Sequence, residues 1–190
     1  MASSISSMLF RCLTTVSGLA FVSCAPTPVG PPQKAQHVLY EWYDDYGPGK
    51  VKVAINLSEQ RASYTRGGRD IGWSYVATGT EGRNTPVGTF PITEKIVDKY
   101  SGSYGWIEDE FGNVTNGDAK PTTPVPQGHR YMPAPMPYWM RLTDYGIGMH
   151  VGNIPQPGEP ASHGCIRMPK DLVPQLFNVV EIGTPVTITR

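Results

Sequence analysis

Ser162-His163-Gly164-Cys165-Ile166-Arg167-Met168 is the stretch from which the fold and the chemistry of this chain are best inferred. Its thiol follows a glycine and stands between a histidine and an arginine. A second histidine, His150, lies fifteen residues before Cys165, directly after the apolar run Gly146-Ile147-Gly148-Met149. Cysteine attacks as a thiolate, so its chemistry needs a nearby base or positive charge. The pattern predicts a nucleophilic thiol at Cys165.

Cysteine usage favours the same role. Cys12 and Cys24 lie in an N-terminal segment that we expect to be processed, so Cys165 is left without an intramolecular partner. Proteins of oxidising compartments usually pair their cysteines or avoid them. The structural alternative is a buried, inert cysteine that packs as a small hydrophobe. The polar, glycine-containing surroundings of Cys165 favour catalysis.

Residues 1–24 have the pattern of a secretory signal, because a short, mostly apolar segment around Arg11 precedes Ser23-Cys24-Ala25-Pro26. The segment is shorter than a membrane-spanning helix requires. Phe21-Val22-Ser23-Cys24 also resembles a bacterial lipobox, whose cleavage leaves a lipidated cysteine at the new N-terminus, although leucine is usual where Phe21 stands. Plain secretion is the alternative. We therefore expect an extracytoplasmic protein, in the periplasm or cell envelope, with a lipid anchor on Cys24.

The rest of the chain is predicted to be a linker and one domain. Residues 25–36 contain four prolines, which indicates an extended linker, and the folded domain is expected over residues 37–190. The 16 basic and 16 acidic side chains of the 190-residue chain cancel, so no positive surplus argues for a nucleic-acid partner. No H-x-x-E-H or C-x-x-C ligand cluster occurs in the sequence, and no metal or other cofactor is predicted.

Composition and patterning favour strands. The chain has 21 glycines and 19 prolines and no long helical period, which predicts short strands and turns. Residues 51–57 alternate apolar and polar side chains, residues 71–78 form the next clear strand pattern, and a final strand is expected over 184–189. Residues 169–177 predict a short helix, with proline tolerated in its first turn. The expected fold class is mainly β, a sandwich with one short helix after Cys165.

Residues 98–130 are the least regular part of the sequence, with aromatic residues scattered among glycines, acids and prolines. A loop of this length inside a compact domain is usually functional or disordered. The aromatic content argues against simple disorder, so we expect a long, functional insertion loop.

The stretch S-H-G-C-I-R-M after an upstream H-x-G resembles the signature of the YkuD-type L,D-transpeptidases, which cross-link bacterial peptidoglycan. Residues 85–90, T-P-V-G-T-F, are similar to the family's second recurring motif, although Pro-x-Gly marks turns in many all-β proteins. The resemblance runs from about Val51 to Ile188. It implies an L,D-transpeptidase-type β-sandwich in which residues 98–130 form a lid or side wall over the active-site cleft and residues 136–142 form the strand beneath it.

The resemblance and the spacing together suggest catalytic roles. Cys165 is the expected nucleophile and His150 the expected general base. In many relatives a backbone carbonyl just after that histidine orients it; here the counterpart is Val151 or Gly152, and Gly152 is favoured. His163 shapes the site in the family, but it is the alternative base because residues two apart on a strand share a face.

The remaining expected site residues would bind substrate or the reacting oxygen. Gly164 lets the backbone approach a substrate carbonyl, where N–H groups around residues 163–165 could bind an oxyanion. The fork of Arg167 suits a substrate carboxylate, with a salt bridge that braces the cleft as the structural alternative. Ser162 is expected to hold the loop by hydrogen bonding and to lie in the binding site. Tyr138 and Trp139, beneath the expected lid, complete the substrate-binding set.

The resemblance implies a two-step acyl transfer on peptidoglycan stem peptides, which serve as donor and acceptor. Cys165 would attack the carbonyl of the third residue of a stem tetrapeptide, D-alanine would leave, and a thioester would form. Attack by the side-chain amine of another stem would give a 3→3 cross-link. Attack by water would make the protein an L,D-carboxypeptidase, and attack by an amine on a protein would anchor that protein to the wall.

Three alternative functions differ in how well they fit the motif. A hydrolase of cross-links or of wall-anchored proteins would use the same thioester, so the sequence leaves it open. A non-catalytic wall-binding module would be expected to carry a degenerate motif, whereas the motif here is intact. A papain-like protease places its cysteine before its histidine, which is the reverse of the order of His150 and Cys165.

Overall fold

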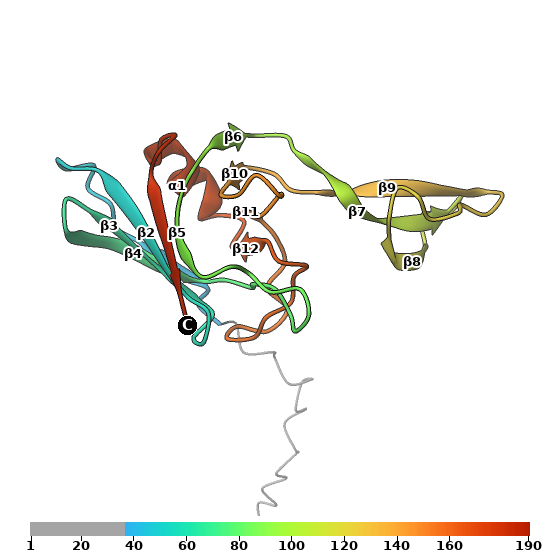
Figure 1. Cartoon of the computed structure of the whole chain (residues 1–190), viewed down its shortest axis with the longest axis horizontal. Coiled ribbons are helices and arrows are strands. Elements are labelled where there is room, and N and C mark those ends of the chain that lie inside the picture. Colours follow the sequence, from blue (N-terminus) through green and yellow to red (C-terminus); the bar gives the residue numbers. More distant parts are fainter. Residues whose placement is uncertain (1–36) are drawn as a thin grey trace, which may run out of the picture. The chain divides into compact units, whose positions relative to one another are not determined.

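The computed structural model describes residues 37–190, which belong to one compact unit (Figure 1). The predicted signal peptide, the Pro-rich linker and the predicted lipidation site Cys24 lie outside the described residues. Within residues 37–190 the chain forms three β-sheets and one helix. The mainly β fold class expected from the sequence is confirmed.

The largest sheet has six strands. In spatial order they are β1 (Tyr40–Trp42), β4 (Arg69–Tyr75), β3 (Arg61–Arg66), β2 (Val51–Asn56), β13 (Pro185–Thr189) and β5 (Gly88–Pro91). Alternate residues of β2 are buried, as its apolar–polar alternation predicted. The final strand β13 pairs in parallel with β2, so the C-terminal end of the domain closes the sheet at its centre.

The second sheet has four strands and contains the motif residues. Its spatial order is β12 (Ile166–Met168), β11 (Gly148–Val151), β10 (Trp139–Arg141) and β6 (Glu94–Ile96). The only parallel pair in this sheet is β11 with β12. The strand expected over residues 136–142 is confirmed as the shorter β10.

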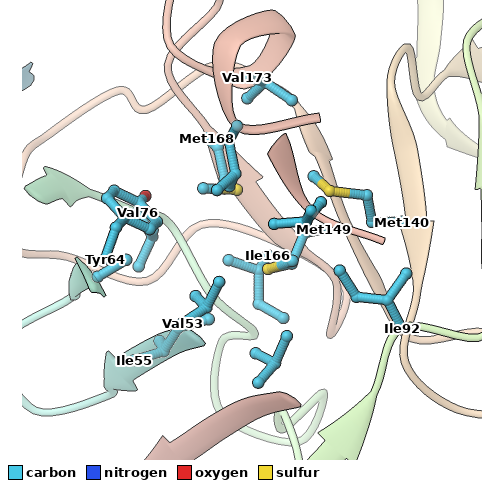
Figure 2. Close-up of a cluster of buried hydrophobic side chains, with 14 of the residues drawn as sticks. Val53, Ile55, Tyr64, Val76, Ile92, Met140, Met149, Ile166, Met168 and Val173 are labelled. Atoms are coloured by element: carbon cyan, nitrogen blue, oxygen red, sulfur yellow. The ribbon is translucent and has the colours of Figure 1, made fainter. Parts of the chain in front are cut away.

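One hydrophobic core lies between these two sheets. Figure 2 shows side chains of the large sheet, such as Val53 and Ile55, facing Met149, Ile166 and Met168 of the small sheet. All five side chains are at most 1% exposed. Because strands alternate their side chains, burying Ile166 and Met168 turns Arg167 toward the other face of β12.

Helix α1 (Val173–Val179) caps the core after the small sheet, and its first turn contains Pro174 in place of Pro169, with which the expected segment began. It begins four residues later than the expected segment 169–177. Lys95 on β6 donates hydrogen bonds of 2.6 Å to the carbonyls of Phe177 and Val180. A helix leaves its last carbonyls without intrahelical partners, so this lysine joins the end of α1 to the small sheet.

The third sheet replaces the expected loop over residues 98–130. It has the spatial order β8 (Val114–Ala119), β7 (Tyr100–Asp109) and β9 (His129–Pro135), and it extends away from the two packed sheets in Figure 1. The prediction of an irregular loop was wrong. No second layer buries β8, so its side chains did not need apolar alternation, and register shifts interrupt the β7–β8 pairing. We call residues 100–135 the arm.

Among residues 37–190, no helix has both the length and the apolar character needed to cross a membrane.

A buried ion pair fixes the segment between β1 and β2. The Asp44 carboxylate, with a fully buried side chain, accepts hydrogen bonds from Nε and Nη2 of Arg66 on β3, the shortest at 2.6 Å. It also accepts one from the backbone N–H of Tyr46 at 3.0 Å. The hydrogen bond from Arg66 is the main reason why the pKa of Asp44 lies below its ordinary value.

Asp44→Asn is expected to lower the free energy of unfolding by about 2 kcal/mol at pH 7, because hydrogen bonds to a charged group are lost. A carboxylate whose folded-state pKa is depressed stabilises the fold above its unfolded pKa, and this contribution is lost as pH falls through the folded value. Urea denaturation at pH 7 and pH 3 should therefore show a difference between wild type and variant that shrinks in acid.

The matched control is Asp45→Asn. Asp45 forms an ion pair with Arg69 in which the two side chains are 60% and 53% exposed. Exposed pairs add little to stability. An equal loss in both variants would contradict the assignment of Asp44 as the buried anchor.

Candidate active site

The parallel pairing of β11 with β12 brings the predicted catalytic residues together. His150 lies opposite Arg167 in the register, and Cys165 precedes the first residue of β12. Cys165 and Arg167 are two residues apart, so they share the face of the sheet opposite the core with His150. The thiol and the imidazole are therefore on adjacent strands and one face, although fifteen residues separate them in sequence.

His150 is oriented as a proton acceptor. Its residue is 6% exposed, and its Nδ1 lies 2.7 Å from the carbonyl oxygen of Val151. A carbonyl only accepts, so Nδ1 carries the proton and Nε2 keeps its lone pair. Burial lowers the pKa of His150 to about 4, so the ring is neutral throughout the neutral range.

The orienting carbonyl is that of Val151 and not the favoured Gly152. Gly152 instead donates its backbone N–H to Met168 at 3.1 Å, which extends the β11–β12 pairing by one residue. A Cβ at Gly152 would lie 2.6–2.9 Å from the side-chain carbons of Arg167. Glycine is needed here because the Arg167 side chain crosses this position.

The loop of residues 162–165, here called the nucleophile loop, is held by its own serine. Ser162 Oγ donates to the carbonyl of Cys165 at 2.5 Å and accepts from the N–H of Gly164 at 3.1 Å. Ser162 is only 3% exposed, so the structure supports its predicted role in holding the loop and does not place it on a substrate surface.

Gly164 has no free backbone group for an oxyanion. Its N–H is bound to Ser162, its carbonyl accepts a hydrogen bond of 2.7 Å from Thr85 Oγ1, and its φ of +115° requires glycine. The N–H groups of His163 and Cys165 are the remaining candidates for oxyanion binding.

Thr85 is a site residue that the sequence analysis missed. Its hydroxyl accepts from the N–H of Gly79 at 2.9 Å and donates to Gly164, so it bridges the nucleophile loop to residues 77–80. The same segment holds the loop through backbone bonds from Ser162 to Thr78 and from Thr80 to Ser162. The T-P-V-G-T-F motif contained this signal, but the pattern alone indicated only a turn.

A cleft of about 350 Å³ opens beside the thiol. Its lining residues come from the arm, the β10–β11 hairpin and the nucleophile loop: Tyr104, Trp139, Arg141, Tyr145, His163 and Cys165 among others. Of the predicted substrate-binding residues, Trp139 lines this cleft but is 1% exposed. Tyr138 instead packs its ring edge-on against Phe177 at 5.4 Å, so the structure does not place it in the cleft.

Arg167 lies outside the lining of that cleft and acts on the thiol through its charge. Burial raises the pKa of Cys165, whereas a hydrogen bond from the backbone of Gly148 and the positive charge of Arg167 oppose that rise. The thiol also donates to the carbonyl of Gly146 at 3.6 Å. The resting site therefore holds a neutral thiol and a neutral His150, and proton transfer must accompany attack on substrate.

His163 is held by the arm. Its ring stacks on Tyr104 at 4.5 Å between centroids, and its Nε2 lies 3.1 Å from Oδ1 of Asp118 on β8. Asp118 also pairs with Arg83 at 3.0 Å. The sequence around Asp118 is a polar run without a motif, so it did not indicate that Asp118 is a site residue. Only the folding of the arm brings β8 to the nucleophile loop.

In the part of the chain that the structure describes, no group of three or more His, Cys, Asp or Glu side chains is arranged to hold a metal ion.

Comparison with known proteins agrees with this geometry. The family model of the L,D-transpeptidase catalytic domain, YkuD, matches residues 50–188. The chain belongs to the L,D-transpeptidase catalytic-domain family. The resemblance found in the S-H-G-C motif is thereby confirmed over almost the range expected from the sequence.

Individual relatives support this assignment. The chain is 31% identical over 144 residues to the Bacillus subtilis (strain 168) protein named "Putative L,D-transpeptidase YqjB", a match that covers 75% of this chain and 73% of the relative. An L,D-transpeptidase from Mycobacterium smegmatis superimposes with a TM-score of 0.57 at 18% identity. The C442S mutant of the Enterococcus faecium L,D-transpeptidase superimposes with a TM-score of 0.56 at 23% identity.

The two solved structures are longer than the region they share with this chain. The match covers 74% of this chain and 59% of the mycobacterial chain, and 75% of this chain and 50% of the enterococcal chain. At these identities the superpositions establish the L,D-transpeptidase fold.

Alkylation of Cys165 by iodoacetamide is expected to accelerate about tenfold per pH unit from pH 6 to 9, because the thiolate reacts and the pKa of this thiol is raised. Arg167→Gln should slow the reaction at each pH, since the positive charge that lowers the Cys165 pKa is lost. Intact-mass spectrometry at fixed times measures both. A rate that is flat between pH 6 and 8 would instead indicate a preformed thiolate–imidazolium pair.

Thr85→Val is expected to reduce the rate of Cys165 acylation by about tenfold or more while the domain stays folded. The variant leaves the N–H of Gly79 and the carbonyl of Gly164 without their shared partner, and misplacement of a nucleophile is costly to rate. Thr89→Val is the control, because the Thr89 hydroxyl contacts Thr187 on the exposed side of the large sheet. Equal effects of both variants would remove Thr85 from the site.

Proposed function

We propose that the protein is a cysteine-dependent L,D-transpeptidase that acts on peptidoglycan stem tetrapeptides through a thioester. One observation carries the proposal: the free thiol of Cys165 lines an open cleft and shares a sheet face with His150, whose Nδ1 is bound to Val151. Family membership over residues 50–188 agrees with this chemistry.

In the first step, Cys165 Sγ attacks the carbonyl carbon of the third stem residue. His150 Nε2 takes the thiol proton and then gives it to the amine of the departing D-alanine, so the C–N bond breaks as the thioester remains. N–H groups of the nucleophile loop stabilise the negative oxygen of the tetrahedral intermediate. The neutral resting state of both groups suits a proton transfer coupled to attack.

In the second step, an acceptor amine attacks the thioester, and a 3→3 cross-link forms when that amine is the side chain of another stem's third residue. Lys99 and Arg141 line the cleft, and although Arg141 is paired with Glu94 at 3.0 Å, the two cationic groups suit the carboxylates of stem peptides. Water at the same thioester would give a tripeptide, so the competition between amine and water decides between transpeptidase and carboxypeptidase.

Residues 1–36 enter the proposal as the means of reaching the wall. We propose that residues 1–24 direct export, that Cys24 is lipidated, and that residues 25–36 hold the catalytic domain away from the membrane. This places the protein outside the cytoplasm, in the periplasm or cell envelope, where stem peptides are accessible.

Cys165→Ala is expected to abolish product formation, with a loss of at least about 10³-fold, while the melting temperature changes by no more than about 3 °C. Purified protein is incubated with a disaccharide tetrapeptide and the products are weighed by mass spectrometry. A dimer lighter by one D-alanine, absent from the variant, establishes L,D-transpeptidation.

Other products would redirect the assignment. A tripeptide monomer alone indicates an L,D-carboxypeptidase. No product from the tetrapeptide, but release of peptides or proteins from intact sacculi, indicates a hydrolase of cross-links or anchored proteins. Full activity in Cys165→Ala would falsify the thioester mechanism, and binding to sacculi with no reaction at all would leave a wall-binding module.

A further inference from the structure

His163 lies between two residues of the arm and shares a cleft with the nucleophile. Tyr104 on β7 stacks on its ring with an interplanar angle of 10°, and Asp118 on β8 binds its Nε2. His163 and Cys165 both line the cleft of about 350 Å³. The arm therefore contacts the nucleophile loop at His163.

The contact with Asp118 selects the tautomer of His163. An ionised carboxylate only accepts hydrogen bonds, so the proton of the neutral ring lies on Nε2 and Nδ1 keeps a lone pair. Asp118 is ionised at neutral pH, because its hydrogen bond from Arg83 lowers its pKa. Stacking on Tyr104 holds the plane of the His163 ring parallel to the tyrosine ring and so restricts its rotation.

Four groups set the electrostatic environment of this ring. Burial is the main cause that lowers the pKa of His163, and the positive charges of Arg83 and Arg167 lower it further. Asp118 acts in the opposite direction, through its charge and its hydrogen bond. The ring of Tyr104 covers one face of the imidazole.

We propose that Asp118 is a positioning residue that holds His163 against Tyr104. In this position, Nδ1 of His163 accepts the proton of the attacking amine. The inference rests on the proposed function, since it concerns the second step. As the N–C bond forms and the C–S bond breaks, the amine proton moves to His163 Nδ1. His163 then passes this proton to the departing thiolate of Cys165. His150 serves the first step and His163 the second.

The exposure of this contact argues against a role in stability alone. The side chain of Asp118 is 54% exposed and that of Arg83 is 42% exposed. Ion pairs so accessible to water contribute little to folding. Asp118 nevertheless joins the edge of the arm to the nucleophile loop through His163, so its effect should appear in the titration and reactivity of that histidine.

The first test follows the ring protons of ¹³C-labelled histidine by NMR across pH in the full-length protein in detergent, with His163→Gln to assign the signal. Asp118→Asn removes a charge that raises the pKa of His163, so its titration should move to lower pH. Arg83→Gln removes a charge that lowers it, so the titration should move to higher pH. Glu110→Gln, at an exposed position of the β7–β8 turn, is the charge-matched control and should move nothing.

The second test separates the two chemical steps by intact-mass spectrometry. Thioester formation from the tetrapeptide should change by less than about twofold in Asp118→Ala, whereas attack by the acceptor amine should slow by about tenfold or more, since general base catalysis is lost. In Asp118→Asn, the rate of the second step should begin to fall at a lower pH than in the wild type. This shift should equal the shift of the His163 titration measured by NMR.

The outcomes distinguish this inference from the function on which it rests. Unmoved titrations in both charge variants, or equal slowing of both steps, overturn the positioning role of Asp118 while the transpeptidase assignment stands. A wild-type protein that transfers no acyl group overturns the proposed function and the role of His163 with it, even if the titrations move as expected.

Discussion

The parallel pairing of β11 with β12 is the constraint on which the rest of the structure depends. Alternation along these strands sends Met149, Ile166 and Met168 into the core, where they are fully buried. The same alternation sends His150 and Arg167 to the opposite face. One register thus fixes the core and the site together. If the pairing shifted by one residue, the core side chains would turn to the face of the site and the site side chains would turn into the core.

A second constraint is the attachment of the nucleophile loop to residues 77–80. This segment leaves the large sheet after β4 and pairs Ala77 with Arg167 and Gly79 with Ser162. The side-chain amide of Gln60 donates to Thr78 Oγ1 at 2.7 Å and accepts from the backbone N–H of Thr78 at 2.8 Å. These two hydrogen bonds fix the segment to the large sheet. The thiol is therefore positioned by the large sheet as well as by its own strand, which reduces the conformational freedom lost when substrate binds.

The electrostatics follow from this burial. His150 is buried and Cys165 is half-buried at the edge of the cleft, and burial shifts the pKa of each toward the value that favours its neutral form. His163 is less buried and is surrounded by charges from the arm and the β4–β5 connection. Two histidines close in sequence to one cysteine thus occupy different environments, which is how one site can assign them different proton transfers.

The sequence by itself determined the family, the mainly β class and three strands of the large sheet, β2, β4 and β13, and it singled out His150 and Cys165 as candidates, since these depend on local alternation and on a motif of fixed spacing. It did not determine the arm, because β8 is exposed and lacks the apolar pattern that burial imposes. Nor did it determine Val151 rather than Gly152 as the orienting carbonyl, the role of Thr85, or the contact of Asp118 with His163. Those depend on backbone geometry and on segments up to 79 residues apart, as in the hydrogen bond between Thr85 and Gly164, and only the packed sheets bring such groups within hydrogen-bonding distance.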